Sequence, residues 1–239
     1  FARSKNLAIT VLGAGSNVVL KSNLFGLVII INFRGIRHSI DGNNVVLSVA
    51  AGENWSELVE YALRNIWYGI ENLVQIPGSV GAAPIQNIGA YGAELKYVFS
   101  SCEAISVSNG VMKTFSKAAC QFRYRNSIFK NELKGQYVIT SVNFLLNKAP
   151  HSINDSFKGL SEKMEGKNKT IQNIAHAVIS IRSKKLPDPQ EIGNSGSFFK
   201  NPVIPVNQFK ALQKQYSNIP HYPNSKGKIK VPAAWMIDI

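Results

Sequence analysis

The sequence predicts a fold of mixed α-helix and β-strand. Short apolar runs bounded by turn residues indicate strands, and the Asn109-Gly110 dipeptide between two such runs is typical of a hairpin turn. Apolar side chains recur at helical spacing from Ile171 to Ile179. The composition, with 45% hydrophobic and 17% charged residues over 239 positions, is that of a folded globular protein.

The first expected elements are two strands around a glycine loop. Apolar runs at residues 7–12 and 26–33 predict the strands, and residues 18–20 predict a further short strand between them. A Rossmann fingerprint requires a third glycine where Val18 stands and a helix that opens at the loop. Because β-branched residues follow instead, the loop joins strand to strand, and the sequence does not predict a Rossmann fold.

The remaining elements follow from hairpin, strand and helix signals. They are hairpins at 36–40/45–51 and 105–107/111–115, a strand at 136–146, a short helical piece within a polar loop at 147–169, and helices from 55, from 171 and at 208–216. Asn54 and Glu57 have the spacing of a capping box, which places the start of the first helix at Trp55. The rigid Pro187-Asp188-Pro189 segment predicts a domain boundary.

Composition limits the possible functions. The longest apolar run, residues 27–31, is too short to cross a bilayer, and no basic start followed by an apolar core indicates secretion. Only Cys102 and Cys120 occur, without metal-ligand spacing, so we expect a cytoplasmic protein with neither a metal site nor a disulfide framework. The net charge of +13 comes from scattered basic residues, which suit either phosphorylated small molecules or nucleic acid.

Two glycine-rich segments carry the strongest chemical signal. The first glycine loop spans residues 13–17, and the second glycine segment, residues 77–92, also contains Gln86 and Asn87. Glycines allow close approach of the backbone and turn successive N–H groups toward an anion, while side-chain amides suit a flat heterocycle. Two such segments suit a dinucleotide, although the second alone is equally typical of a tight structural loop.

Arg123, Arg125 and Ser197 are candidate functional side chains. On an extended segment the two arginines share one face, where a guanidinium could hold a carboxylate; a pair of surface arginines is the alternative. Ser197 lies between a glycine and two phenylalanines, which suits either a proton donor in a dry pocket or a turn residue. The Gly-x-Ser-x-Gly pattern of a hydrolase is absent there.

Seven segments, in order along nearly the whole chain, form a set of motifs. They are Gly13-Ala14-Gly15-Ser16-Asn17, Ala51-Gly52-Glu53-Asn54-Trp55, Glu71-Asn72-Leu73, residues 76–92, Tyr124-Arg125-Asn126-Ser127-Ile128-Phe129-Lys130, Lys185-Leu186-Pro187-Asp188-Pro189 and residues 193–202. On these residues the chain resembles the UDP-N-acetylenolpyruvoylglucosamine reductases, flavin enzymes that complete UDP-N-acetylmuramate in peptidoglycan synthesis. The Gly-Ser-Phe-Phe-Lys-Asn-Pro run in the last segment is the most specific of these motifs.

The resemblance implies an α+β fold. Its FAD-binding part is a pair of subdomains of the vanillyl-alcohol-oxidase type, which we expect at residues 1–40 and 41–189, with a variable loop at 147–169. Residues 190–239 then begin a substrate domain. The resemblance also implies that an entry strand, most of a first helix and a catalytic glutamate fall outside these residues. We therefore expect weak flavin retention and no turnover from the chain as written.

The resemblance implies roles for the candidate residues. NADPH reduces bound FAD and leaves, and a hydride then passes from flavin N5 to C3 of the enolpyruvyl group. Arg125 matches the arginine that stabilises charge on the substrate carboxylate, and Ser197 matches the proton donor to C2. The implied FAD-binding positions are Gly13, Gly15, Ser16, Asn17, Pro77, Gly78, Ser79, Gly81, Gln86, Asn87, Gly89 and Ala90. The implied positions for the UDP diphosphate or cofactor phosphates are Lys185, Asn201 and Tyr222.

One departure and two alternative classes accompany this interpretation. Phe157 falls where longer members carry a tyrosine on a mobile loop, so a hydroxyl that clamps the diphosphate is missing. FAD-dependent oxidases of alcohols or sugars share the fold class, but residues 75–93 contain no histidine or cysteine to tether the flavin. A basic nucleic-acid-binding module is the alternative from another class. We expect a monomer that takes a UDP-sugar and binds neither nucleic acid nor a membrane.

Overall fold

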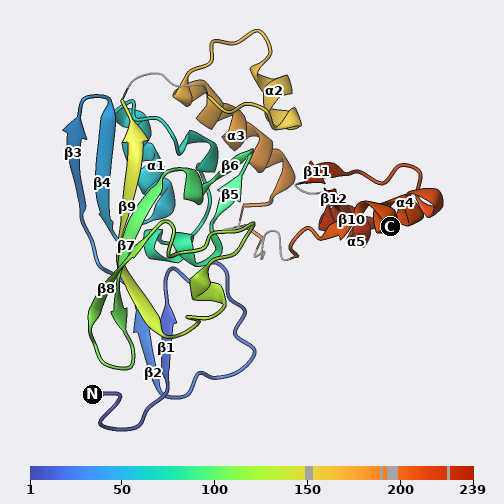
Figure 1. Cartoon of the computed structure of the whole chain (residues 1–239). Helices are drawn as coiled ribbons and strands as arrows, with labels where there is room; N and C mark the ends of the chain where they lie inside the picture. Colours follow the sequence, from blue (N-terminus) through green and yellow to red (C-terminus); the bar gives the residue numbers. More distant parts are fainter. Residues whose placement is uncertain (149–152, 189–190, 193–198, 225–226) are drawn as a thin grey trace. The chain divides into compact units, whose positions relative to one another are not determined.

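The structure is a computed structural model that describes residues 1–148, 153–188, 191–192, 199–224 and 227–239. It divides into two compact units, Phe1–Asp188 and Pro189–Ile239 (Figure 1). Both units combine helices with strands, so the expected mixture of α and β elements is confirmed. The finer assignment of FAD-binding subdomains within the first unit stays a prediction.

The centre of the first unit is a five-stranded antiparallel sheet with the order β3-β4-β9-β7-β8 (Figure 1). Its strands are β3 (Ile36–Asp41), β4 (Asn44–Ala50), β7 (Phe99–Ser106), β8 (Met112–Ser116) and β9 (Tyr137–Asn147). The two hairpins and the long strand expected from the sequence are therefore confirmed. In β4 the alternate residues Val45, Leu47 and Val49 are fully buried, which directs one face of the sheet into the core.

Two smaller strand pairs lie outside this sheet. Strands β1 (Ile9–Leu12) and β2 (Leu27–Ile30) pair in parallel, and β5 (Gly89–Ala90) pairs with β6 (Ala93–Glu94) in a short hairpin. No helix opens at the glycine loop after β1, as the sequence indicates. The expected short strand at residues 18–20 is wrong, because this segment has no pairing partner and Val18, Val19 and Leu20 are exposed.

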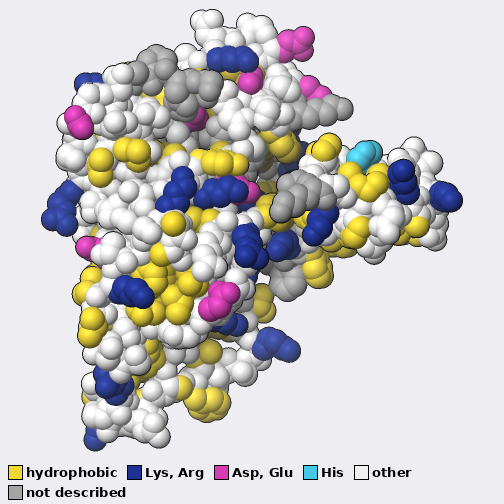
Figure 2. Space-filling view, in the orientation of Figure 1, with side chains coloured by type: hydrophobic (Ala, Val, Ile, Leu, Met, Phe, Trp, Pro, Cys, Tyr) yellow, Lys and Arg dark blue, Asp and Glu magenta, His cyan; other side chains and the backbone are white. Residues whose placement is uncertain are grey.

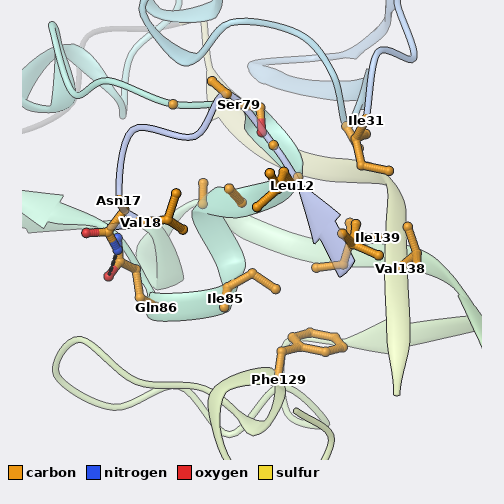
Figure 3. Close-up of a pocket in the computed structure, with 18 of the residues that line it drawn as sticks. Leu12, Asn17, Val18, Ile31, Ser79, Ile85, Gln86, Phe129, Val138 and Ile139 are labelled. Carbon is orange, nitrogen blue, oxygen red and sulfur yellow. Dashed lines mark hydrogen bonds between the residues drawn. The ribbon is translucent and has the colours of Figure 1, made fainter. Parts of the chain in front are cut away.

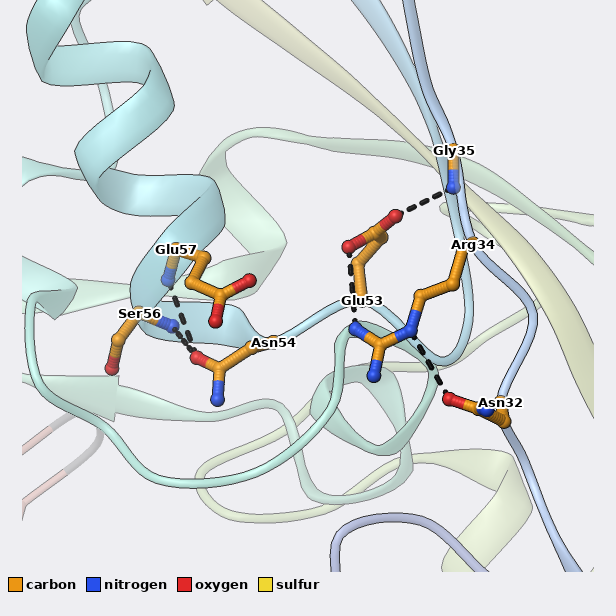
Figure 4. A network of polar contacts seen from close by, with 7 residues as sticks. All are labelled: Asn32, Arg34, Gly35, Glu53, Asn54, Ser56 and Glu57. Carbon is orange, nitrogen blue, oxygen red and sulfur yellow. Dashed lines mark hydrogen bonds and ion pairs between the residues drawn. The ribbon is translucent and has the colours of Figure 1, made fainter.

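The helices of the first unit bury apolar faces against the core. They are α1 (Trp55–Arg64), α2 (Lys158–Met164), α3 (Ile171–Lys185) and the 3₁₀ segments η1 (Glu71–Leu73), η2 (Val80–Gln86), η3 (Leu95–Tyr97) and η4 (Ile128–Lys130). The side chain of Asn54 accepts hydrogen bonds from the N–H groups of Ser56 (2.8 Å) and Glu57 (3.2 Å), which caps α1 at the expected position (Figure 4).

The turn before α1 is tied to the segment before β3. The Glu53 carboxylate accepts a hydrogen bond from the N–H of Gly35 at 2.5 Å and lies 3.5 Å from the Arg34 guanidinium (Figure 4). Arg34 in turn donates to the side chain of Asn32 at 3.1 Å. These contacts fix the path of the chain that connects β2 to the large sheet.

The second unit has its own small core. Its elements are β10 (Val203–Pro205), α4 (Val206–Gln215), β11 (Tyr222–Asn224), β12 (Lys228–Lys230) and α5 (Ala233–Asp238). Strand β12 pairs with both β10 and β11, and Phe209, Ile219 and Val231 are buried together. The helix expected around residues 208–216 is confirmed as α4.

The surface matches the scattered charge of the sequence. In the view of Figure 2, lysine and arginine side chains are dispersed over the visible surface among hydrophobic and uncharged groups. Within the described part of the chain, no helix has the length and apolar character needed to cross a membrane.

Candidate functional site

A cavity of about 400 Å³ lies within the first unit, which is a volume typical of ligand pockets (Figure 3). The first glycine loop and the start of the second glycine segment form its polar wall. Nine of the twelve predicted FAD-binding residues line it: Gly13, Gly15, Ser16, Asn17, Pro77, Gly78, Ser79, Gly81 and Gln86. The fold thus brings together two segments that are about sixty residues apart in the sequence.

The two glycine segments touch each other along this wall. The side-chain amide of Asn17 donates to the side-chain carbonyl of Gln86 at 3.1 Å (Figure 3). A Cβ atom at Gly13 would overlap the Ser79 hydroxyl, and Gly78 adopts φ +125°, a conformation that favours glycine. Glycine is therefore needed here both for space and for backbone conformation.

The polar wall presents hydrogen-bond donors that have no partner in the described part of the chain. Among the residues that the structure describes, the N–H groups of residues 13–17, Gly78 and Ser79 make no hydrogen bond, and neither does the Ser79 hydroxyl. The Ser79 side chain is nonetheless buried, with 6% of its surface exposed. The N–H groups of residues 14–17 belong to exposed residues, where water or a ligand can accept from them, whereas a buried donor such as the Ser79 hydroxyl is normally satisfied. The wall is therefore suited to a ligand that accepts several hydrogen bonds, such as a diphosphate.

The opposite wall is apolar and was not predicted from the sequence. It includes Phe129 from η4 and the start of β9, where Tyr137, Val138 and Ile139 line the cavity (Figure 3). The signal for this wall was that successive residues at the start of the strand are apolar. Because only one face of a strand can pack on the core, such a run indicates that the other face lines a pocket. Lys130 and Lys134 also line the cavity and add positive charge beside an anionic ligand.

Arg125 does not line this cavity but lies beside the β5–β6 hairpin. Its guanidinium donates to the carbonyl of Gly89 and packs 5.1 Å from the ring centroid of Tyr124. The segment is not extended, so the condition under which Arg123 and Arg125 would share one face is not met. Arg123 and Asn126 exchange backbone hydrogen bonds at 3.0 and 3.1 Å, and Arg125 adopts φ +50° inside this turn.

The arginine keeps capacity for a ligand. Among the described residues, the carbonyl of Gly89 is the acceptor that the Arg125 side chain reaches. A guanidinium has five N–H donors in a fixed fork, so donors remain for a carboxylate.

Three predicted FAD-binding residues lie away from the cavity wall. Gly89 and Ala90 form β5, and Asn87 is completely buried just after η2. The Asn87 side chain is occupied by protein groups, to which it donates and from which it accepts. Contact of these three residues with FAD stays a prediction.

The predicted substrate-binding residues are divided between the two units. Lys185 is the exposed last residue of α3, while Asn201 and Tyr222 belong to the second unit. The Asn201 side-chain carbonyl accepts from the N–H of Ala233 at 2.9 Å, and Tyr222 is 44% exposed. Ser197 lies outside the described residues. The roles of these four residues stay predictions.

Phe157 occupies a packed position rather than an open one. It precedes α2, is half-buried, and meets the ring of Tyr91 edge-on at a centroid distance of 5.2 Å. Burial raises the pKa of the Tyr91 hydroxyl above its usual value, while the charge of Arg182 and its hydrogen bond oppose that shift. Tyr91 is therefore a neutral hydroxyl at physiological pH.

Comparison with known proteins places this cavity in a class. Residues 1–116 match the family model described as an FAD binding domain. This span contains both glycine segments that form the polar wall of the cavity. The fold and the site thus define an FAD-binding protein.

The relatives identify the family. The chain is 43% identical over 239 residues to UDP-N-acetylenolpyruvoylglucosamine reductase of Flavobacterium johnsoniae, covering 98% of this chain and 71% of that protein. It is 47% identical over 231 residues to the reductase of the same name from Amoebophilus asiaticus, covering 95% and 68%. The chain belongs to the UDP-N-acetylenolpyruvoylglucosamine reductase family.

A solved structure agrees with the fold. The crystal structure of UDP-N-acetylenolpyruvylglucosamine reductase from Thermus caldophilus superposes with a TM-score of 0.58 at 23% identity, covering 84% of this chain and 64% of that one. The expected FAD-binding α+β fold is therefore confirmed.

Proposed function

We propose that this protein is an FAD-dependent oxidoreductase that reduces the enolpyruvyl ether of UDP-N-acetylglucosamine to UDP-N-acetylmuramate, with NADPH as reductant. The name shared by its relatives and the match to an FAD-binding family support the reaction. The single observation that supports the cofactor most directly is the cavity wall, whose loop N–H groups and buried Ser79 hydroxyl have no partner among the described residues. We further propose that the protein acts in the cytoplasm, as a monomer, in cell-wall synthesis.

The residues around the cavity fit FAD. The first glycine loop and Gly78–Ser79 would hold the diphosphate through backbone N–H groups and the Ser79 hydroxyl, as oriented amides do in anion-binding nests. Lys130 and Lys134 would offset part of its negative charge. The apolar wall that includes Phe129 and Ile139 offers contact to a planar ring.

Bound FAD, once reduced by NADPH, would supply the hydride that reaches C3 of the enolpyruvyl group. Arg125 would bind the adjacent carboxylate and stabilise the negative charge that spreads onto it when C3 accepts hydride. Ser197 would donate its proton to C2, so that one hydride and one proton are added across the double bond. Lys185, Asn201 and Tyr222 would hold phosphate groups of the UDP-sugar or of the cofactor.

A spectrum and one variant test this proposal. The full-length enzyme should bind FAD non-covalently, because residues 75–93 contain no histidine or cysteine; acid precipitation should then release the flavin into the supernatant. In Ser197→Ala of the full-length enzyme, flavin reduction by NADPH should persist, while reoxidation by the enolpyruvyl substrate should slow by roughly 10²–10⁴-fold. Equal slowing of both half-reactions would make Ser197 structural, and absence of flavin binding would reject the proposal.

A further inference from the structure

We infer that Asn87 is a positioning residue for Arg125. Its buried side chain holds the turn that contains Arg125 against the β5–β6 hairpin, and the Arg125 guanidinium bonds the same hairpin. This inference rests on the proposed function, in which Arg125 binds the substrate carboxylate. It differs from a role for Asn87 in contacting FAD, because the side chain is buried among protein groups.

The Asn87 amide ties its own segment to two others, residues 94–96 and the turn at Arg123. Its NH₂ group donates to the Glu94 carboxylate at 3.0 Å and to the carbonyl of Arg123 at 3.0 Å, and its oxygen accepts from the N–H of Lys96 at 3.0 Å. Both amide hydrogens are thus used, and the side chain is 0% exposed. A fully satisfied buried amide fixes the segments that it joins.

The bonds from Asn87 form a closed ring with Arg125. The carbonyl of Arg123 also accepts from the N–H of Asn126 at 3.1 Å, which closes the turn in which Arg125 lies. The guanidinium of Arg125 reaches the carbonyl of Gly89, and Gly89 pairs with Glu94 across the β5–β6 hairpin. Because the Glu94 carboxylate also accepts from Asn87, the backbone and the guanidinium of Arg125 are held by one hydrogen-bond network.

Two backbone features support this arrangement. Asn87 itself adopts φ +47° and ψ +67°, the left-handed region that asparagine tolerates better than most residues. A Cβ atom at Gly89 would lie 2.8 Å from a guanidinium nitrogen of Arg125, so glycine leaves the space in which the guanidinium lies. Lys96 completes the network with an ion pair to Glu94 at 2.7 Å.

Asn87→Asp is the informative variant because it keeps the shape and removes the NH₂ donors. The new carboxylate would face both the Glu94 carboxylate and the Arg123 carbonyl, so the turn should detach from the hairpin. Asn87→Gly removes these two bonds and the one from the N–H of Lys96 without adding charge, and it suits the positive φ, so it keeps the test valid if the aspartate variant does not fold. Asn143→Asp is the matched control, because Asn143 donates to Ser101 at 3.0 Å within the large sheet.

The first readout needs neither cofactor nor turnover. In the unmodified chain the Nη–Hη NMR signal of Arg125, whose Nη2 donates to the carbonyl of Gly89, should be resolved and slow to exchange with water; it is assigned by its loss in Arg125→Lys. Asn87→Asp and Asn87→Gly should broaden it or speed its exchange, while Asn143→Asp should not. A signal that is already exchange-broadened in the unmodified chain, or that no Asn87 variant changes, would overturn the inference.

The second readout separates positioning from cofactor contact. In the Asn87 variants, the Kd for FAD should stay within about threefold of the unmodified value, since no bond to FAD is lost. In the full-length enzyme, the same variants should slow reoxidation of reduced flavin by the enolpyruvyl substrate by roughly 10- to 100-fold, with flavin reduction by NADPH retained. A larger loss of FAD affinity than of reoxidation rate would make Asn87 a cofactor contact. If unmodified protein binds no FAD, the proposed function fails, and the NMR result still decides the role of Asn87.

Discussion

The hydroxyl group of Ser79 is buried on the wall of the cavity without a protein partner among the described residues. Such a group destabilises the folded protein unless something binds it, because its hydrogen bonds to water are lost on folding. A diphosphate oxygen would satisfy it with a charge-assisted hydrogen bond. The Ser79 hydroxyl should therefore destabilise the unliganded protein and stabilise its complex with FAD.

We predict that Ser79→Ala raises the Kd for FAD by roughly 10- to 100-fold, the equivalent of one hydrogen bond to a charged group. The Tm of the unliganded protein should stay the same or rise. Ser127→Ala is the control, because Ser127 is also buried but donates to the carbonyl of Ile85 at 2.7 Å and accepts from the N–H of Phe129 at 3.2 Å. It should lower the free energy of unfolding by about 1 kcal/mol. Fluorescence titration with FAD and thermal denaturation measure both effects; unchanged FAD affinity in Ser79→Ala would contradict the assignment.

We also predict that Gly13→Ala weakens FAD binding by more than about tenfold, because the new methyl group would overlap the Ser79 hydroxyl and displace it from the cavity wall. Gly159→Ala in α2 provides the comparison, since its Cβ would meet Phe157 at an ordinary distance of 3.5 Å. That change should leave FAD affinity unaltered. Equal effects of the two substitutions on FAD affinity would show that the close approach of the two glycine segments is unimportant.

The conformation of the turn that contains Arg125 cannot be predicted from the residues next to it in the sequence. Alternation of Arg123 and Arg125 suggests an extended strand with a shared face, yet the segment forms a turn. The turn depends on Asn87, 36 residues earlier, whose amide reaches the carbonyl of Arg123. No local pattern at residues 123–126 encodes that bond, so the conformation could not be predicted from the sequence.

Elements whose signals are local were predicted well. Helix α1 begins at Trp55 because Asn54 caps it, and β7–β8 turns at Asn109-Gly110, where Gly110 has φ +76°. The failure at residues 18–20 has the opposite cause, since an apolar run forms a strand only when a partner strand lies beside it. The polar wall of the cavity was predicted from glycine content. Its apolar wall depends on where the start of β9 lies in the folded chain, which no local pattern gives.

For helix α1 we predict that Asn54→Ala lowers the free energy of unfolding by about 1 kcal/mol, because two backbone N–H groups lose their acceptor. Urea denaturation should show a lower midpoint with an unchanged m-value. Asn65→Ala at the other end of α1 should cost less, since the Asn65 side chain donates one bond to the carbonyl of Tyr61. If both variants unfold at the unmodified midpoint, the cap does not stabilise the helix in this protein.

At the scale of the whole molecule, the two units have separate hydrophobic cores. One core is built around the large sheet and its helices, and the other around Phe209, Ile219 and Val231. Units with separate cores can fold independently. All residues that line the proposed FAD cavity belong to the first unit.

We therefore predict that residues 1–188 alone fold and bind FAD, with a Kd within about threefold of that of residues 1–239. Saturation should raise the Tm of both chains, because a ligand that binds only the folded state at 100 times its Kd adds about 2.7 kcal/mol. Ser79→Ala in the shorter chain should reduce this shift by the same amount as in the longer one, which ties the effect to the cavity. Residues 189–239, tested as the counterpart, should not quench flavin fluorescence. A folded 1–188 chain that no longer binds FAD would show that the second unit supplies part of the cofactor site.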